Sequence, residues 1–144
     1  MNICLLTIGD ELLEGIIRNS NAEWLATELW ARGMTLNEHV TVADQTENIV
    51  NTLQRLSKTA DLCVVSGGLG PTPDDLTIDA LATMVGDALV TDEAQFQRLL
   101  QKGLGNDRAR QQSRRPKSAQ SFDNPEGHAN LGKFGQLFIC KMHA

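Results

Sequence analysis

The fold of this chain is decided by the stretch Val64–Thr77, VVSGGLGPTPDDLT. It passes from an apolar segment through a glycine-rich turn to two carboxylates, Asp74 and Asp75, that open an apparent helix. This order forms a cradle for phosphate, because glycines let backbone N–H groups approach an anion closely and a helix start attracts negative charge. The turn contains no lysine, which excludes the phosphate loop of the nucleoside triphosphatases. Backbone amides and a divalent metal would therefore have to meet the charge of a phosphate. The alternative is a structural turn whose aspartate caps a helix.

The composition indicates a single globular domain over residues 1–144. Hydrophobic residues make up 41% and charged residues 22% of the 144 positions. The net charge of −5 argues against nucleic acid as a partner. The three cysteines lie in apolar runs, which predicts buried thiols in a reducing compartment. The apolar start has no basic segment before it, so we expect neither a signal peptide nor a membrane span, and a cytoplasmic protein.

Apolar runs alternate with helical patterns along the chain. Capping-box spacing predicts helix starts at Ser20, with Glu23, and at Asp44, with Glu47. This alternation predicts an α/β fold with a mostly parallel sheet covered on both faces. The expected strands cover 3–8, 36–42, 62–65 and 137–140, and the expected helices begin near Ser20, Asp44, Leu76 and Thr91.

Polar residues follow three of the expected strands at the same edge of the sheet. Asp10 and Glu11 follow the first strand, Asp44 the second, and Asp75 the third. Ligands of open parallel sheets bind at the carboxyl ends of the strands. Converging carboxylates would repel one another unless a cation joined them, and Mg²⁺ is the natural candidate. The alternatives are that Asp44 only caps its helix and that Asp10 and Glu11 are solvated loop acids.

Motifs in roughly the first two-thirds of the chain resemble those of CinA-type (competence/damage-inducible) proteins. They are TIGDELLEG at 7–15, NSN at 19–21, VAD at 42–44 and SGGLGPTPDDLT at 66–77. The wider superfamily is the MoaB/Mog-like molybdopterin-binding fold, a three-layer α/β/α domain. The resemblance therefore implies this fold for the whole chain.

The resemblance also implies two related activities. In the Mog branch, the aspartates matching Asp44 and Asp75 serve adenylyl transfer to molybdopterin, with Mg²⁺ and the glycine loop holding the phosphates. In the CinA branch, the domain is associated with hydrolysis of ADP-ribose to AMP and ribose 5-phosphate. Leu69 favours the CinA branch. Full-length CinA proteins often carry a C-terminal amidase domain acting on nicotinamide mononucleotide, which we do not expect in this chain.

The residues and the resemblance together predict a site for a nucleotide or pterin phosphate ligand and a divalent metal, Mg²⁺ or Co²⁺. The predicted catalytic residues are Asp44 and Asp75. The predicted ligand-binding residues are Gly9, Asn21, Ser66, Gly67, Gly68, Leu69, Gly70 and Thr77. The predicted metal ligands are Asp10, Glu11, Asp74 and Asp75. The alternative is a domain that binds such a ligand without turning it over.

The last third of the chain departs from the family pattern. ARQQSRRP at 109–116 stands where the family has Asn-Arg-x-Gln-Ala-x-x-Pro, and the chain ends soon after the last expected strand. We therefore expect a fold incomplete at its C-terminus, with an inactive shortened paralogue as an alternative. The basic residues within 108–117 are expected to be solvated and mobile.

Association with other chains is also expected. Relatives are generally oligomers, and an unpaired final strand would leave a sheet edge that another chain could cover. Trp24 and Trp30 are expected in helix packing or in an interface. We therefore predict a homo-oligomer. The scattered histidines, His39 among them, are expected to be structural or solvated.

Overall fold

The computed structural model describes residues 1–70, 72, 75–122, 131–134 and 137–139. The strands are β1 (Ile3–Ile8), β2 (Leu36–Val42), β3 (Leu62–Ser66), β4 (Leu89–Thr91), β5 (Arg114–Pro116), β6 (Gln120–Phe122), β7 (Leu131–Phe134) and β8 (Leu137–Ile139). The helices are α1 (Asp10–Leu13), α2 (Ser20–Ala31), α3 (Thr46–Leu56), α4 (Thr77–Val85), α5 (Glu93–Gln101) and α6 (Asn106–Gln112).

The main sheet is mixed but mostly parallel, as predicted. Its order is β2-β1-β3-β8-β7-β6, with parallel pairing from β2 to β8 and antiparallel pairing of β7 with β8 and with β6. The final expected strand is confirmed as β8, although Cys140 lies outside the described residues. This strand does not leave the open sheet edge that was considered as a site for another chain, because β8 lies between β3 and β7.

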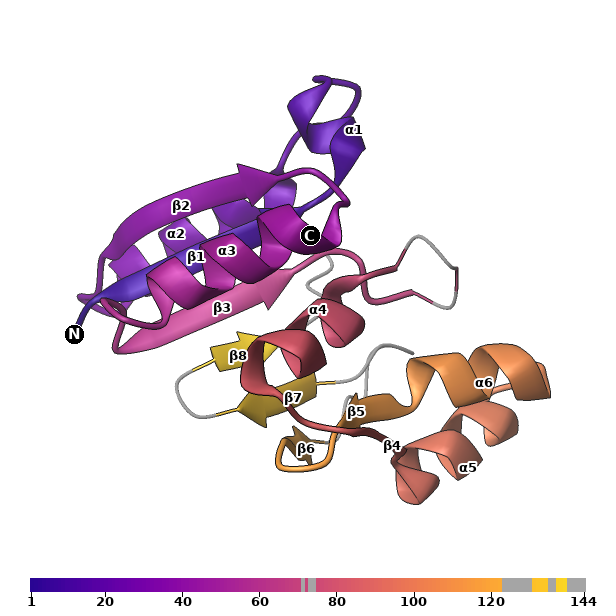
Figure 1. Cartoon of the computed structure of the whole chain (residues 1–144). Helices are drawn as coiled ribbons and strands as arrows, with labels where there is room; N and C mark the ends of the chain where they lie inside the picture. Colours follow the sequence, from indigo (N-terminus) through magenta and orange to yellow (C-terminus); the bar gives the residue numbers. More distant parts are fainter. Residues whose placement is uncertain (71, 73–74, 123–130, 135–136, 140–144) are drawn as a thin grey trace.

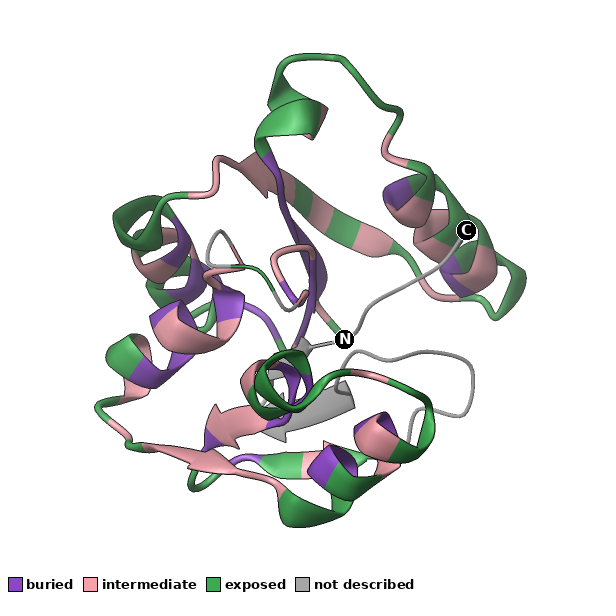
Figure 2. Ribbon diagram, turned by 90° about the vertical axis from the view of Figure 1, so that its right-hand side faces the viewer, coloured by how far each residue is buried: buried purple, intermediate pink, exposed green. Residues whose placement is uncertain are grey.

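Helices cover both faces of the sheet, which gives the expected three layers (Figure 1). On one face, Ala22 of α2 packs with Leu5 and Val64. On the other face, α3 and α4 bury a larger core with Leu6 and Val65. All six residues of β1 are buried, and Figure 2 shows this strand at the centre of the domain. Coverage of both faces explains why β1 is a continuous apolar run.

A smaller unit follows α4, and it orders the basic stretch. An antiparallel ribbon of β4 and β5 leads to α5 and α6, which pack through Phe96, Leu99 and Ala109. Arg114 donates two hydrogen bonds to Asp79 of α4, at 3.0 and 2.7 Å.

The expectation of a solvated basic run is therefore wrong for Arg114 and Arg115, whose side chains are 25% and 27% exposed, whereas Arg110 is exposed. Arg115 pairs with Asp92 at 3.1 Å, and Arg110 lies 4.8 Å from the centre of the Phe96 ring. The Arg114–Asp79 pair holds the segment after α6 to α4, whereas the other two contacts join β5 and α6 to α5 and its capping residue Asp92.

Two predicted helix caps are wrong. Asn19, rather than Ser20, caps α2, and its Oδ1 accepts the N–H of Ala22 at 3.1 Å. Asp44 does not cap α3, which begins after Gln45 without a side-chain cap, because the Asp44 carboxylate is bonded to Asp10 instead. The capping pattern does not distinguish adjacent cap-forming residues, nor does it reveal a partner 34 residues away.

Burial confirms some of the remaining predictions. Cys4 and Cys63 are free and buried, as expected. Packing within this chain does not bury the tryptophans, since Trp24 is 48% and Trp30 75% exposed. Across the described residues, no helix combines the length and apolar character needed to cross a membrane.

Candidate functional site

The glycine loop after β3 has a conformation that only glycine accommodates. Gly67 and Gly68 have φ angles of +102° and +58°. A Cβ on Gly67 would lie 2.0 Å from the carbonyl oxygen of Ile8, and one on Gly68 would lie 2.5 Å from Thr77 Oγ1. Thr77 is fully buried, and its hydroxyl donates to the Gly67 carbonyl at 2.8 Å. The loop is thus built into the end of β3 and the start of α4, with Thr77 beneath it as a support.

Asp75 closes the other end of the loop. Its Oδ2 accepts hydrogen bonds from the N–H of Thr72, at 2.8 Å, and from the Thr72 hydroxyl. A Cβ on Gly70 would lie 2.6 Å from the same oxygen, so the glycine lets the carboxylate lie against the loop. The side chain of Leu69 is buried in the core. Asp74, a predicted metal ligand, lies outside the described residues.

Asp10 and Asp44 join the loops that follow β1 and β2. The N–H of Asp10 donates to Asp44 Oδ2 at 3.2 Å, and the N–H of Asp44 donates to Asp10 Oδ1 at 3.1 Å. The adjacent Gly9 is buried and donates its N–H to the Val42 carbonyl at 3.1 Å. These contacts place Asp10 and Asp44 at one edge of the sheet, as the sequence predicted.

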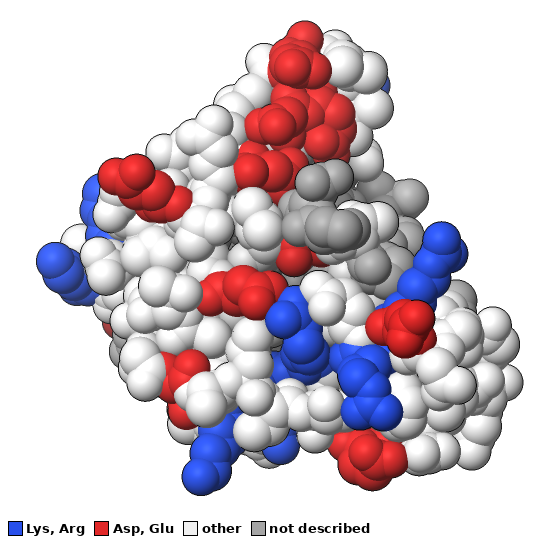
Figure 3. Space-filling model, turned by 45° about the vertical axis from the view of Figure 1, so that its right-hand side comes forward, with Lys and Arg blue, Asp and Glu red and all other residues white. Residues whose placement is uncertain are grey.

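The pKa of Asp44 is raised, first by burial and then by the charges of Asp10, Glu11 and Asp75, while the hydrogen bond from Asp10 opposes the rise. Carboxylates from the loops after β1 and β3 therefore act on Asp44, which follows β2, through their charges. Figure 3 shows acidic side chains gathered where α1 lies, at the top of that view. Such a group of carboxylates favours the approach of a cation.

The same carboxylates do not form a ready-made metal cage. Within the described ranges, no group of three or more His, Cys, Asp or Glu side chains could hold a metal ion. The arrangement fits a hydrated Mg²⁺ that takes one or two carboxylates and completes its shell with water and substrate phosphate. It does not fit an ion bound entirely by protein ligands.

Two cavities lie on either side of the glycine loop. The larger, of about 170 Å³, is lined by residues of β1, α1, α2 and the end of β3, including Thr7, Glu11, Asn21, Ser66 and Gly67. Two of these lining residues are bonded to each other: Asn21 Nδ2 donates to Ser66 Oγ at 3.3 Å. Four of the predicted site residues therefore meet in one cavity.

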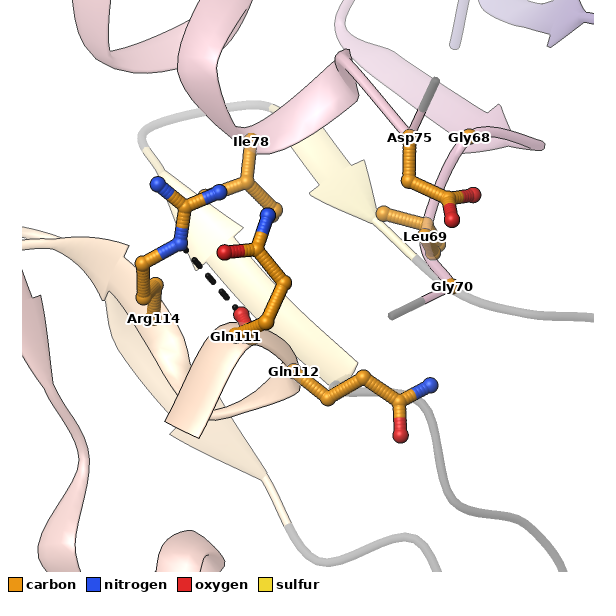
Figure 4. A pocket seen from close by; sticks show the side chains of 8 residues that line it. All are labelled: Gly68, Leu69, Gly70, Asp75, Ile78, Gln111, Gln112 and Arg114. Carbon is orange, nitrogen blue, oxygen red and sulfur yellow. Dashed lines mark hydrogen bonds between the residues drawn. The ribbon is translucent and has the colours of Figure 1, made fainter. Parts of the chain in front are cut away.

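The smaller cavity, of about 10 Å³, lies between the loop and α6 (Figure 4). The predicted residues Gly68, Leu69, Gly70 and Asp75 line one side. The other side consists of residues that the sequence reasoning did not assign to the site: Ile78, Gln111, Gln112 and Arg114. The sequence did contain a signal for Gln112. The family segment Asn-Arg-x-Gln-Ala-x-x-Pro has a glutamine four residues before its proline, and Gln112 lies four residues before Pro116.

A second group missed from the sequence supports the start of α2. Asn19 Nδ2 donates to Thr7 Oγ1 at 3.0 Å and lies 3.2 Å from His39 Nε2. Thr7 Oγ1 is also 3.0 Å from that nitrogen. Burial lowers the pKa of His39. The capping residue of α2, whose first turn lines the larger cavity, is therefore anchored to the sheet.

Comparisons with known proteins agree with this architecture. The family model described as "Probable molybdopterin binding domain" matches residues 4–121. The "CinA-like protein" of Escherichia coli (strain SMS-3-5 / SECEC) and the "NMN amidohydrolase-like protein YfaY" of Escherichia coli (strain K12) are each 37% identical over 147 residues. Each alignment covers 99% of this chain and 36% of the relative. The chain thus spans about a third of the length of these relatives.

Solved structures of CinA and MoaB proteins are also similar to this chain. The crystal structure of CinA from Thermoplasma acidophilum, a protein with unknown function, has a TM-score of 0.86 and 29% identity, covering 96% of this chain and 86% of that one. MoaB from Thermus thermophilus has a TM-score of 0.59 and 20% identity over 96% of this chain and 77% of its own, which shows the shared fold. Since the family model spans most of the chain and the motifs agree, this protein belongs to the family of probable molybdopterin-binding domains, as a CinA-type member.

Proposed function

We propose that this domain binds a phosphorylated nucleotide or pterin at the glycine loop and hydrolyses a nucleoside diphosphate compound such as ADP-ribose. The observation that carries the proposal is the position of the loop between two cavities, beside the linked carboxylates Asp10 and Asp44. A diphosphate compound has two organic halves joined by phosphates. The loop would hold the phosphates, and the larger cavity, of about 170 Å³, would receive one organic half.

The roles follow from the chemistry of the residues. Backbone N–H groups of Gly67, Gly68 and Gly70 would bind phosphate oxygens, since a loop of this kind concentrates donors without a charged side chain. Asp44 would orient and deprotonate the attacking water. The raised pKa of its carboxylate makes it a stronger base than an ordinary aspartate. Asp75, held by Thr72, would fix the end of the loop close to the phosphates.

A divalent cation, Mg²⁺ or Co²⁺, is part of the proposal. One or two of the predicted metal ligands Asp10, Glu11, Asp74 and Asp75 would hold it together with the phosphates of the ligand. Such an ion would neutralise phosphate charge as the bond to the leaving group breaks. The charges of Asp10, Glu11 and Asp75 raise the pKa of Asp44, which supports a cation at this edge of the sheet.

Incubation with ADP-ribose and either Mg²⁺ or Co²⁺, followed by quantification of AMP and ribose 5-phosphate, tests the activity directly. Asp75→Asn is the informative variant, because an asparagine oxygen can still accept the hydrogen bond from Thr72 while the charge is lost. We expect metal-dependent AMP release that falls at least about 100-fold in this variant. Asp107→Asn, an exposed change on α6, is the matched control and should retain full rate.

Absence of AMP from the folded wild-type protein would contradict the hydrolase. Equal rates in Asp75→Asn and Asp107→Asn would instead remove Asp75 from the site. Melting curves of all three proteins establish that any loss of rate is not a loss of fold.

A second candidate is favoured by the family match, whose description is molybdopterin binding. The same loop would then hold the phosphate of a pterin, either for adenylyl transfer or in a binding module without turnover. Calorimetric titration with molybdopterin, with and without ATP and Mg²⁺, separates the two candidates. Saturable pterin binding together with no AMP from ADP-ribose would favour the second.

Assembly and location complete the proposal. We propose a homo-oligomer in the cytoplasm, supported by the exposure of Trp24 and Trp30 on α2 and by the free buried thiols of Cys4 and Cys63. Sedimentation velocity of the wild type and of Trp30→Ser tests the assembly. A monomer at micromolar concentration would contradict it.

A further inference from the structure

Gln112, at the end of α6, has a side-chain oxygen whose burial the fold does not explain. The residue is 8% exposed. Among the residues that the structure describes, Gln112 Oε1 is buried without a hydrogen-bond partner. Buried polar atoms in native proteins are nearly always paired, because leaving one unpaired costs stability. An exception at a ligand cavity suggests that the partner arrives with the ligand.

The position of Gln112 supports this reading. It lines the same small cavity as Gly68, Gly70 and Asp75, so it lies across from the proposed phosphate grip. Figure 4 shows its side chain extending from the end of α6 on the side where Gly70 lies. The Arg114–Asp79 pair fixes the neighbouring segment, which keeps α6 close to the loop.

The size of the cavity limits the partner. About 10 Å³ has room for one water-sized group and excludes a ring. Oε1 can only accept a hydrogen bond, so the group must be a donor. In a phosphorylated ribose, the ring hydroxyls are the small donors closest to the phosphate.

We propose that Gln112 is a specificity-determining residue whose Oε1 accepts a hydrogen bond from a ribose hydroxyl of the ligand. This inference rests on the proposed function, because it requires a ribose phosphate at the glycine loop. It adds a residue of α6 to that site and a preference for ribose over deoxyribose.

The test measures the affinity of AMP, 2′-deoxy-AMP and 3′-deoxy-AMP for wild type and Gln112→Met by calorimetry. Methionine is close to glutamine in size and has no comparable acceptor. We expect one deoxy compound to bind the wild type about tenfold more weakly than AMP, as the loss of one hydrogen bond implies. Gln112→Met should bind AMP about tenfold more weakly and should not distinguish the three compounds. Gln54→Met, an exposed change on α3, is the matched control.

Thermal melts provide an independent readout. If the ligand pairs with Oε1, Gln112→Met should melt at the same temperature as the wild type or higher, since the variant removes an unpaired buried acceptor. Gln112→Glu keeps the acceptor, and it should retain the discrimination between ribose and deoxyribose even where its overall affinity falls. It also serves as the second variant if Gln112→Met does not fold.

Three results would overturn the inference. The first is identical discrimination in wild type and Gln112→Met, the result expected if a bound water alone pairs with Oε1. The second is an equal loss of affinity for all three compounds with the discrimination intact. The third, no binding of any compound to the folded wild type, would contradict the proposed function as well, and is therefore distinguishable from the first two.

Discussion

Asp10 and Asp44 hold each other through their backbones: each carboxylate accepts the N–H of the other residue, at 3.2 and 3.1 Å. This pair connects the loops that follow β1 and β2, and it brings two negative charges together. The structure therefore stabilises the position of the carboxylates while their charges repel. A cation or a proton would relieve that repulsion.

Removing the charge of Asp44 tests whether the repulsion between Asp10 and Asp44 destabilises the fold. In Asp44→Asn the amide oxygen can still accept from Asp10, while the charge disappears. Because the pKa of Asp44 is raised in the fold, the native state holds that proton more tightly than the unfolded chain does. The stability due to Asp44 is therefore lost as the pH rises above its ordinary value of 3.8. We expect Asp44→Asn to melt at a higher temperature than the wild type at pH 7 without metal.

Added Mg²⁺ should raise the melting temperature of the wild type more than that of Asp44→Asn. Differential scanning fluorimetry over a range of pH and Mg²⁺ concentration measures both effects, with Asp107→Asn as the control. An unchanged melting temperature and an equal response to Mg²⁺ would show that the repulsion is negligible.

Gly67→Ala tests the requirement for glycine in the loop. The added Cβ would meet the Ile8 carbonyl, and the φ of +102° is strained for alanine. We expect a loss of at least about 3 kcal/mol in the free energy of unfolding, because strain and a backbone clash add. Gly86→Ala, at φ +65° with open space around it, should cost only about 1 kcal/mol. Urea titration of both variants provides the comparison, and equal losses would argue against the clash.

The ion pair between Arg114 and Asp79 should contribute more than an exposed pair. Their side chains are 25% and 40% exposed, and the contact is bidentate. We expect Arg114→Met to cost about 1–2 kcal/mol in the free energy of unfolding. Arg18→Met, which breaks a pair with side chains 85% and 66% exposed, should cost less than about 0.5 kcal/mol. Chemical denaturation distinguishes these values, and similar losses would contradict the argument.

His39 should make stability depend on pH in the range below neutrality. Burial lowers its pKa, so the folded state favours the neutral ring, whose Nε2 lies near Asn19 and Thr7. The stability due to the neutral ring is present above the ordinary pKa of 6.5 and is lost as the pH falls through the folded value. We expect His39→Gln to show a flatter dependence of melting temperature on pH between about 7 and 5. Parallel curves for the two proteins would exclude this role.

The fold was largely predictable because its signals are local. The buried run of β1, the glycine turn after β3 and the apolar faces of the helices each follow from short-range patterns. The partner of Asp44 was not predictable in this way. An aspartate at this position can either cap α3 or accept a hydrogen bond from Asp10, and the local sequence is the same in both cases. The sheet order also placed β8 in the interior, which depends on pairings with a hairpin that the sequence does not mark.

The candidate site was predicted where its residues follow the strand ends or belong to the family motifs. The glycine loop and Asp75 came from a single motif, and the structure keeps them together. Gln112 and Arg114 were missed because their placement depends on pairs such as Arg114–Asp79, which join segments 35 residues apart. A charged run in the sequence gives no indication of such partners, so the pattern alone predicts a solvated segment.

Thr77 holds the start of the glycine loop in place through a buried hydroxyl that donates to the Gly67 carbonyl, and neither α2 nor α6 takes part in that bond. The proposed phosphate-binding loop and the cavity walls supplied by α2 and α6 therefore belong to different segments of the chain. If the proposed function holds, substitutions in α2 or α6 would change which compound is selected while the loop keeps its shape. A domain divided in this way can acquire new ligands by changing its walls alone, so relatives with one loop and different substrates are an expected product of its evolution.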